Sequence, residues 1–392
     1  LSCNGLGLSP MQVLSGLLQS SSQLPEGFGF TEQDAIFIYQ GRYAVYLICQ
    51  LLQIGVGDEV IVPAYNCGAE IDPFVWAGAK VIFYRIDEHA TIDIADIIRH
   101  VTPATKIIYV SHFFGWPQEM EALVKLCKEK GLFLVEDCAL CLFSKGPDNT
   151  IGRTGDAAIY SFVKSLPLPD GGALILRNKA LWQETIPFRQ PRFRNVLLNS
   201  LPLLKKGFMN SNKFWQRYEF TRKLLNKSWL KKSTAQDHEI EREMPKGNYF
   251  DSQKIGWSIS KLSKGIISKT NPYKIVEQRR RNYQYLHNAL QKLSSISLLF
   301  KYLPDNVCPL AFPIYVRNRN RWADELEGRG ILVGGWPSYH RGFDWGDFPE
   351  ARHLKNDLLT LPVHQELTLE HMKYIAECVH SVAEKHGHYH SR

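Results

Sequence analysis

Residues 160–176 read YSFVKSLPLPDGGALIL and place a single lysine between an apolar run and a proline-containing turn. Lys164 is followed by no acidic residue before Asp170, so an ordinary surface ion pair does not explain its position. Apolar neighbours disfavour the charged ammonium group, and a neutral amine is a nucleophile toward carbonyl groups. The alternative is a lysine that reaches solvent from a loop, which is commoner for any single lysine.

Two further residues could act together with this lysine. Asp137 follows the apolar run LFLV, so its carboxylate is expected at the rim of a sheet, although it could also cap the next helix. Ser161 lies three residues before Lys164, and the glycines of the DGG turn allow close backbone approach. A carboxylate for a pyridinium nitrogen, a lysine for an aldehyde and a serine for a phosphate together describe a site for pyridoxal phosphate.

The elements expected around these residues alternate between helices and strands. Apolar spacing predicts a helix within 41–55, a strand within 58–66, and helix–strand pairs within 68–87, 91–115 and 119–139. This alternation predicts an α/β fold with parallel βαβ units in a doubly wound sheet. Such sheets bind ligands at the carboxyl ends of their strands, where the segments PAYNC, SHFFG, EDCA and SFVK are expected to meet.

The pattern changes at residues 188–240, which are basic and aromatic and show no strand pattern. Apolar spacing then predicts a long helix within 271–293, strands within 308–316 and 330–337, and a closing helix within 368–386. We therefore expect a large domain over residues 1–245, with a basic insertion at about 188–235. An interdomain helix and a smaller α+β domain are expected over residues 246–392, because 392 residues exceed one typical domain.

The composition is that of an ordinary globular protein, with 44% hydrophobic and 22% charged residues. No run approaches the roughly 18 apolar residues of a spanning helix, and the first residues lack the basic region of a signal peptide. We therefore expect a soluble cytoplasmic protein. Cys138 and Cys141 have C-x-x-C spacing, but no second pair or histidine cluster completes a metal site, so no metal is expected.

The net charge of +8 is unevenly distributed along the chain. Residues 188–232 contain twelve Lys or Arg against one acid, Glu219, so this segment carries +11 and the remainder −3. Leucine and aromatic residues are mixed with these cations, which fits an interfacial helix, a helix at a subunit contact or a solvated face. Contact with a membrane surface is therefore one alternative for this segment. Nucleic acid is not expected, because no recognisable binding module accompanies the charge.

A longer series of motifs carries a family resemblance. It comprises IGVGDEVIVPAYNCGAEIDPFVWAGAKVIFYRID, VTPATKIIYVSHFFGWPQEMEAL, KEKGLFLVEDCA and IGRTGDAAIYSFVKSLPLPDGGALIL. These segments resemble the DegT/DnrJ/EryC1/StrS aminotransferases, which are pyridoxal-phosphate enzymes of fold type I. The resemblance is strongest from about Gly41 to Arg177 and returns at residues 361–379.

The resemblance implies roles for individual residues. Lys164 would be the lysine that binds the cofactor as an internal aldimine, Asp137 would pair with the pyridine nitrogen, and Ser161 would hold the phosphate. The turn Gly41, Arg42, Tyr43 begins a helix and would add backbone N–H donors to the same phosphate.

Other positions match the family loosely or depart from it. Asn248 loosely matches an asparagine that reaches the partner's cofactor phosphate across a dimer interface, and His112 is expected to be a structural or supporting residue. Cys67 stands where an aromatic residue usually stacks on the cofactor ring, so Tyr65 or another residue would cover that face. Leu140 replaces a polar residue that usually contacts the cofactor.

The implied reaction moves an amino group from an amino-acid donor, glutamate or glutamine, to a nucleotide-linked keto sugar, in a homodimer. One alternative is another pyridoxal-phosphate reaction such as sugar dehydration, although the family's dehydratases have histidine in place of the lysine. A second is a divergent enzyme scaffold whose basic insertion binds a membrane surface.

Overall fold

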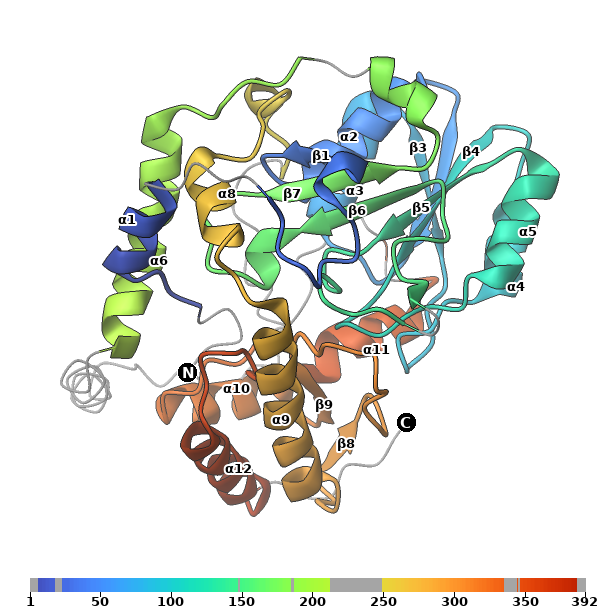
Figure 1. The fold of residues 1–392 in the computed structure, drawn as a ribbon. Coiled ribbons are helices and arrows are strands. Elements are labelled where there is room, and N and C mark those ends of the chain that lie inside the picture. Colours follow the sequence, from blue (N-terminus) through green and yellow to red (C-terminus); the bar gives the residue numbers. More distant parts are fainter. Residues whose placement is uncertain are drawn as a thin grey trace.

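The computed structural model describes residues 6–17, 23–146, 149–184, 187–211, 249–334, 344 and 346–385. Its largest element is a seven-stranded sheet with the strand order β1-β7-β6-β5-β4-β2-β3 (Figure 1). The strands are β1 (Ala35–Ile38), β2 (Glu59–Pro63), β3 (Lys80–Tyr84), β4 (Thr105–Ser111), β5 (Phe133–Asp137), β6 (Ala157–Ser161) and β7 (Gly172–Leu176). The five neighbouring strands β3, β2, β4, β5 and β6 run parallel. At one edge, β7 pairs antiparallel with β6, and β1 pairs antiparallel with β7.

Helices cover both faces of this sheet, as the sequence predicted. Helices α2 (Gly41–Leu51) and α3 (Gly68–Ala77) pack on one face, against alternate strand residues such as Val60 and Tyr109. Helices α4 (Ile94–His100) and α5 (Glu121–Lys130) pack on the other face, against Ile61 and Ile108. Successive strand residues point to opposite faces, so strands buried on both sides are apolar throughout.

Further helices and several 3-10 turns complete this part of the chain. A third apolar cluster joins β6 and β7 to α8 (Lys261–Ile267) on the face that α4 and α5 also cover. Helix α1 (Pro10–Leu17) packs against α8, and α6 (Phe193–Ser211) lies beside α1 at the same edge of the molecule (Figure 1). The 3-10 turns are η1 (Glu32–Asp34), η3 (Phe162–Lys164), η4 (Lys179–Glu184) and η6 (Ser252–Lys254).

The C-terminal residues form a second, smaller unit, a sheet with packed helices, which lies below the large sheet in Figure 1. Its three-stranded antiparallel sheet has the order β10-β9-β8 and packs its apolar face on α9 and α12. The elements are α9 (Pro272–Leu290), β8 (Ile296–Leu298), β9 (Phe312–Val316), α10 (Arg319–Gly328), α11 (Pro349–Asp357), β10 (Leu358–Leu361) and α12 (Leu369–Ala383). The α/β class with a smaller α+β part is therefore confirmed, while a domain boundary near residue 245 stays a prediction.

The strand predicted within residues 330–337 falls partly outside the described residues, which reach Gly334. In the described part, Leu332 and Gly334 take part in isolated bridges, and Gly334 pairs antiparallel with Thr360 of the small sheet. Gly330 adopts a left-handed conformation with φ 81° directly after α10, so the chain turns sharply before it reaches the sheet. The partner strand of Gly334, β10, was not expected from the sequence. Among the described helices, none combines the length and apolar character that crossing a bilayer requires.

Candidate active site

Four predicted ligand-binding segments meet at one edge of the large sheet. Strands β2, β4, β5 and β6 are neighbours and run parallel, so their carboxyl ends, at Pro63, Ser111, Asp137 and Ser161, lie on the same side. Ser111 is the direct partner of Asp137 in the pairing of β4 with β5. The expectation that these strand ends gather at a common edge is therefore confirmed by the strand order.

Asp137 is a buried carboxylate with a defined orientation. It is 4% exposed, and its Oδ1 accepts the N–H of Ala139 at 2.8 Å while its Oδ2 accepts the hydroxyl of Tyr109, also at 2.8 Å. Burial raises the pKa of Asp137, whereas these two hydrogen bonds and the positive charge of Lys164 oppose the rise. A buried acid with fixed partners and a nearby amine is typical of a functional site.

Lys164 ends the 3-10 turn η3 that follows β6, and its side chain is half-buried. Burial raises the pKa values of Asp137, Glu70 and Cys67, and the positive charge of Lys164 opposes this rise in all three, so the amine lies within electrostatic reach of these groups. The adjacent residues Phe162, Leu166 and Leu168 are buried in the core, so the turn itself is anchored. The structure therefore brings the predicted lysine and the predicted carboxylate into one site.

A clamp from the C-terminal part of the chain holds the lysine turn. The carbonyl oxygen of Ser165 accepts hydrogen bonds from Nη2 of Arg279 at 3.3 Å and from Nε2 of Gln365 at 2.9 Å. Arg279 is buried in α9 and also donates to the carbonyl oxygens of Pro309 and Leu310. The sequence analysis missed Arg279 and Gln365, because neither lies near Lys164 along the chain.

Replacing Arg279 with methionine should destabilise the protein, because it leaves several buried carbonyl groups without a donor. We expect the free energy of unfolding to fall by about 3 kcal/mol, measured by urea denaturation followed by circular dichroism. Arg281 is exposed on the same helix, so Arg281→Met is a matched control that should change stability by less than about 0.5 kcal/mol. Equal stabilities of the two variants would show that the clamp contributes nothing.

The start of α2 lies against the end of β6. A Cβ atom built on Gly41 would contact the Cβ of Ser161 at 3.7 Å, so the two residues are neighbours across the strand end. Gly172 is paired with Ser161 in the sheet, and a Cβ on it would lie 2.7 Å from the carbonyl oxygen of Tyr160 and 3.0 Å from the amide nitrogen of Gly41. Because residue 172 is glycine, the N-terminus of α2 and the hydroxyl of Ser161 can lie next to each other.

Substituting alanine at Gly172 should push β7 away from the start of α2. We expect the free energy of unfolding to fall by roughly 2 kcal/mol, because backbone atoms cannot yield as a flexible side chain can. Gly55→Ala is the control, since a Cβ at Gly55 meets nothing within 4 Å. Thermal denaturation of both variants measures the effect, and a Gly172→Ala protein as stable as the control would contradict the contact.

The other two residues of the turn at 41–43 differ in their contacts. Arg42 donates from Nη1 to the carbonyl oxygen of Tyr249 and stands over the Tyr249 ring, 5.9 Å from its centroid. Tyr43 donates its backbone N–H to Gln40 and its hydroxyl to the carbonyl oxygen of Asp251. The backbone amides of Gly41 and Arg42 are at the first two helical positions, where no carbonyl of the helix itself can accept them.

The helix N-terminus after β2 brings a carboxylate that the sequence analysis missed. Cys67 is the N-cap residue of α3, and Glu70 lies in the first turn. Burial and the charge of Asp137 raise the pKa of Glu70 well above its ordinary value. Among the described residues, neither Oε2 of Glu70 nor Oδ1 of Asn66 has a hydrogen-bond partner, although both atoms are buried. In the sequence, the only indication of a role for Glu70 was its position three residues after Cys67, at the start of a predicted helix.

Glu70 should make stability depend on pH in the cofactor-free protein. A carboxyl group whose pKa is raised on folding favours the protonated native state, so its cost appears as the pH rises above the ordinary value of 4.5. We expect Glu70→Gln to raise the melting temperature at neutral pH by on the order of 2 °C and to change it little below pH 4. An increase of the same size at both pH values would contradict this assignment.

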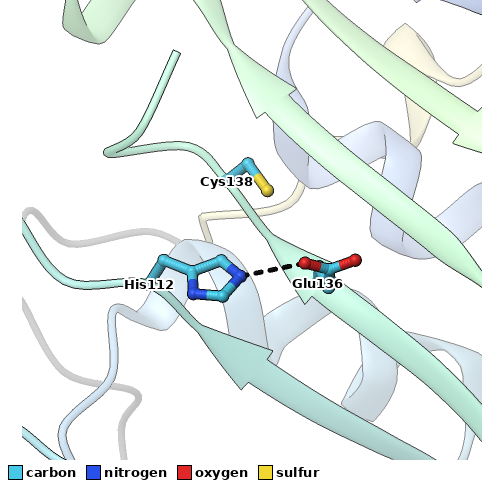
Figure 2. A group of neighbouring side chains, drawn as sticks. All are labelled: His112, Glu136 and Cys138. Atoms are coloured by element: carbon cyan, nitrogen blue, oxygen red, sulfur yellow. Dashed lines mark hydrogen bonds and ion pairs between the residues drawn. The ribbon is translucent and has the colours of Figure 1, made fainter. Parts of the chain in front are cut away.

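His112, Glu136 and Cys138 form a buried cluster whose ligand atoms lie within 4.8 Å of one another (Figure 2). His112 Nδ1 accepts the N–H of Gln118, so Nε2 carries the proton and donates to Glu136 Oε2 at 3.1 Å. Glu136 also accepts the backbone N–H groups of residues 152, 154 and 155.

These bonds use both nitrogens of His112 and all four acceptor positions of the Glu136 carboxylate. Burial raises the pKa of the Cys138 thiol well above its ordinary value, which keeps it protonated and a poor metal ligand. Burial opposes ionisation of Glu136, yet the hydrogen bonds from His112 and from the backbone lower its pKa. The cluster therefore ties the loop at 152–155 to β5 and leaves no free lone pair for a metal ion.

The remaining predicted residues are placed as follows. Tyr65 and Leu140 are buried in the core, and Cys67 is half-buried. Asn248 lies outside the described residues. Cys141 donates from Sγ to the carbonyl oxygen of His112, and the seven cysteines in the described ranges are all free thiols.

Solved structures share this fold. The aminotransferase TlmJ of Streptoalloteichus hindustanus superposes with a TM-score of 0.67 at 20% identity, covering 97% of this chain and 92% of that one. DesV of S. venezuelae superposes with a TM-score of 0.67 at 20% identity over 95% and 94% of the two chains. The mostly parallel sheet and its flanking helices therefore define a protein with the fold of these aminotransferases.

Sequence comparison finds a family model that matches part of the chain. Residues 30–197 match the model of the DegT/DnrJ/EryC1/StrS aminotransferase family. Two curated relatives are a dTDP-4-dehydro-2,3,6-trideoxy-D-glucose 4-aminotransferase of Saccharopolyspora spinosa and a GDP-perosamine synthase of Escherichia coli O157:H7. Identity to the first is 35%, over 37% of this chain and 38% of the relative; identity to the second is 33%, over 41% and 46%. The matched region thus spans less than half of each relative's length.

Proposed function

We propose that this protein is a pyridoxal-phosphate-dependent aminotransferase that transfers an amino group from glutamate or glutamine to a nucleotide-linked keto sugar. One observation carries the proposal. Asp137 and Ser161 end the neighbouring parallel strands β5 and β6, and Lys164, three residues beyond Ser161, acts electrostatically on Asp137. A buried acid, a hydroxyl and an amine thus stand at the edge where α/β sheets bind ligands.

The described residues fit the cofactor in charge and in hydrogen-bonding capacity. Asp137 would bind the protonated ring nitrogen, and Ser161 with the amides of Gly41 and Arg42 would bind the phosphate, since helix N-termini favour anions. Buried polar atoms without partners, on Glu70 and Asn66, mark the same edge as a place for a polar ligand. Once bound, pyridoxal phosphate supplies an aldehyde that carries the amino group and a ring that accepts the electrons of the broken bond.

Each side chain of the site would have one role in the proposed reaction. Lys164 Nζ would take the proton from the α-carbon of the amino donor and return it on the acceptor side, as general base and acid. Asp137, oriented by Tyr109 and by the amide of Ala139, would keep a proton on the ring nitrogen. Arg279 and Gln365 hold the carbonyl of Ser165, so the turn that carries Lys164 does not shift during proton transfer.

The substrate class is proposed from two lines of support. Relatives named for acting on dTDP- and UDP-linked sugars match 37% and 36% of this chain. Residues 188–232 carry twelve cations against one acid, which suits a diphosphate-bearing substrate.

Sugar dehydration is the competing reaction within the same class. Lys164 counts against it, because the dehydratases of the family have histidine at this position. Incubation with glutamate and a keto sugar nucleotide separates the two: accumulation of the amino sugar supports transamination, and a deoxygenated ketone supports dehydration.

We also propose that the protein is a cytoplasmic homodimer. Free thiols at the seven described cysteines favour a reducing compartment. Sedimentation equilibrium tests the dimer. A second role, contact with a membrane surface through residues 188–232, is favoured by the exposed face of α6 and does not depend on the reaction.

Direct chemical labelling tests the cofactor proposal. Purified protein loaded with pyridoxal phosphate is treated with borohydride, digested and mapped by mass spectrometry. The adduct is expected on the peptide that contains Lys164. A protein that stays colourless with added pyridoxal phosphate, or an adduct on another lysine, would overturn the proposal.

A further inference from the structure

Helix α6 presents an exposed face that is both apolar and basic. Leu197, Leu198, Leu201 and Phe208 are each 44–53% exposed, although such side chains are usually buried. Spacings of three and four residues place them on one side of the helix, together with the exposed Arg194 and Lys205.

The opposite side of α6 is anchored to the protein. Val196 and Ser200 are buried, and Asn199 donates from Nδ2 to the hydroxyl of Tyr39 and to the carbonyl oxygen of Pro169. The carbonyl oxygen of Leu203 accepts the N–H of Leu8. The exposed face is therefore held in a fixed orientation at the edge of the molecule (Figure 1).

Helix α1 lies beside α6 and adds exposed apolar side chains. Met11, Leu14 and Leu17 are exposed on α1. Gly7, just before α1, and Gly207 of α6 pack backbone to backbone, because a Cβ on Gly7 would lie 2.2 Å from the amide nitrogen of Gly207. Large apolar side chains are thus exposed on both of these neighbouring helices.

The charge of this region decides what can cover it. Helix α6 contains no acidic residue, and residues 188–232 carry a net charge of +11. A symmetric contact with a second copy would bring two such regions together, and like charges oppose it. Cations mixed with leucine and phenylalanine on one helix face are typical of helices that lie in the interface of an anionic bilayer.

We propose that the exposed face of α6 docks the protein on the surface of an anionic phospholipid membrane. Leu197, Leu198, Leu201 and Phe208 would enter the headgroup region, while Arg194 and Lys205 would contact lipid phosphates. The α1 helix would lie against the same surface. The site at the carboxyl edge of the large sheet would then work close to the bilayer, where lipid-linked molecules are found, yet the proposal stands independently of the reaction.

Vesicle flotation of the full-length protein tests the proposal. Binding is expected to vesicles of phosphatidylcholine with phosphatidylglycerol, not to phosphatidylcholine alone, and should weaken as salt is added. Arg194→Gln with Lys205→Gln is expected to lower the partition coefficient about 30-fold, from the usual contribution of a cation near an anionic surface. Leu198→Gln with Leu201→Gln should lower it at least about tenfold.

Matched controls lie at the opposite edge of the molecule, on α4 and α5 (Figure 1). Lys125→Gln with Lys128→Gln removes two exposed cations, and Ile98→Gln removes an exposed apolar side chain. These variants should bind vesicles as the wild type does, and they and the leucine variant should keep the transamination rate with soluble substrates.

Three results would overturn the proposal. The first is no binding of the wild type to anionic vesicles, and the second is unchanged binding of the leucine variant. The third is a wild-type dimer that the leucine exchange converts to monomers without any vesicle binding, which would assign the face to a second copy of the chain.

Discussion

Replacement of Lys164 by alanine is expected to lower kcat by at least about 10⁴-fold, because the amine that would hold the cofactor and move the proton is removed. Lys164→Arg should lose as much, since a guanidinium keeps the charge and cannot act as a nucleophile or base at neutral pH. Steady-state kinetics with glutamate and a keto sugar nucleotide provide the measurement.

The control for this prediction is Lys179→Ala, which removes an exposed lysine on η4 that pairs with Asp34. It should leave kcat unchanged. Circular dichroism should show that Lys164→Ala retains the native fold, since the side chain is half-buried in a turn held by other residues. A Lys164→Ala enzyme with more than a few per cent of the wild-type rate would disprove the assigned role.

The second large effect is expected at Asp137. Asp137→Asn removes the negative charge beside the ring nitrogen and should lower kcat about 10³-fold, while the dissociation constant of pyridoxal phosphate rises about tenfold. Stability of the cofactor-free protein should change by less than about 1 kcal/mol, because the loss of one acceptor for Ala139 or Tyr109 is offset by removal of a carboxylate whose ionised form burial makes unfavourable. Fluorescence titration with the cofactor and thermal denaturation separate binding from stability.

Asp156→Asn is the matched control for Asp137→Asn, because it changes a carboxylate in the same sheet that lies away from the site. Asp156 lies at the other end of the sheet, where its Oδ2 accepts the N–H of Leu134 at 2.8 Å. Asp156→Asn should cost some stability and leave kcat within about twofold. If Asp156→Asn reduced kcat as strongly as Asp137→Asn does, the loss would reflect the sheet rather than the site.

Much of the large sheet could be predicted from the sequence. The helices at 41–51, 68–77, 94–100 and 121–130 and the strands that follow them matched the apolar spacing, because side-chain periodicity is a local property. Gly78 and Gly131 end two of these helices in the left-handed conformation, which glycine adopts at little cost.

The antiparallel strands were harder to predict. Strand β1 lies between α1 and α2 and pairs with β7, more than one hundred residues later, and no local pattern specifies that partner. Strand β10 has only four residues, fewer than periodicity can distinguish from a turn. Residues 330–334 make isolated bridges, with Gly334 pairing to Thr360 of β10, a partner that no local pattern specifies.

By itself, the sequence determined which chemical groups follow the strands: the acid at 137, the hydroxyl at 161, and the lysine three residues further on. The end of an apolar strand can be predicted from the sequence, because the residues that form the strand and those that follow it are neighbours in the chain. Only the tertiary structure decided that Glu70 lies beside Asp137 and that Arg279 and Gln365 hold the carbonyl of Ser165, from 114 and 200 residues away. Such contacts arise when separate elements pack together, and packing depends on the shape of the whole core rather than on local spacing.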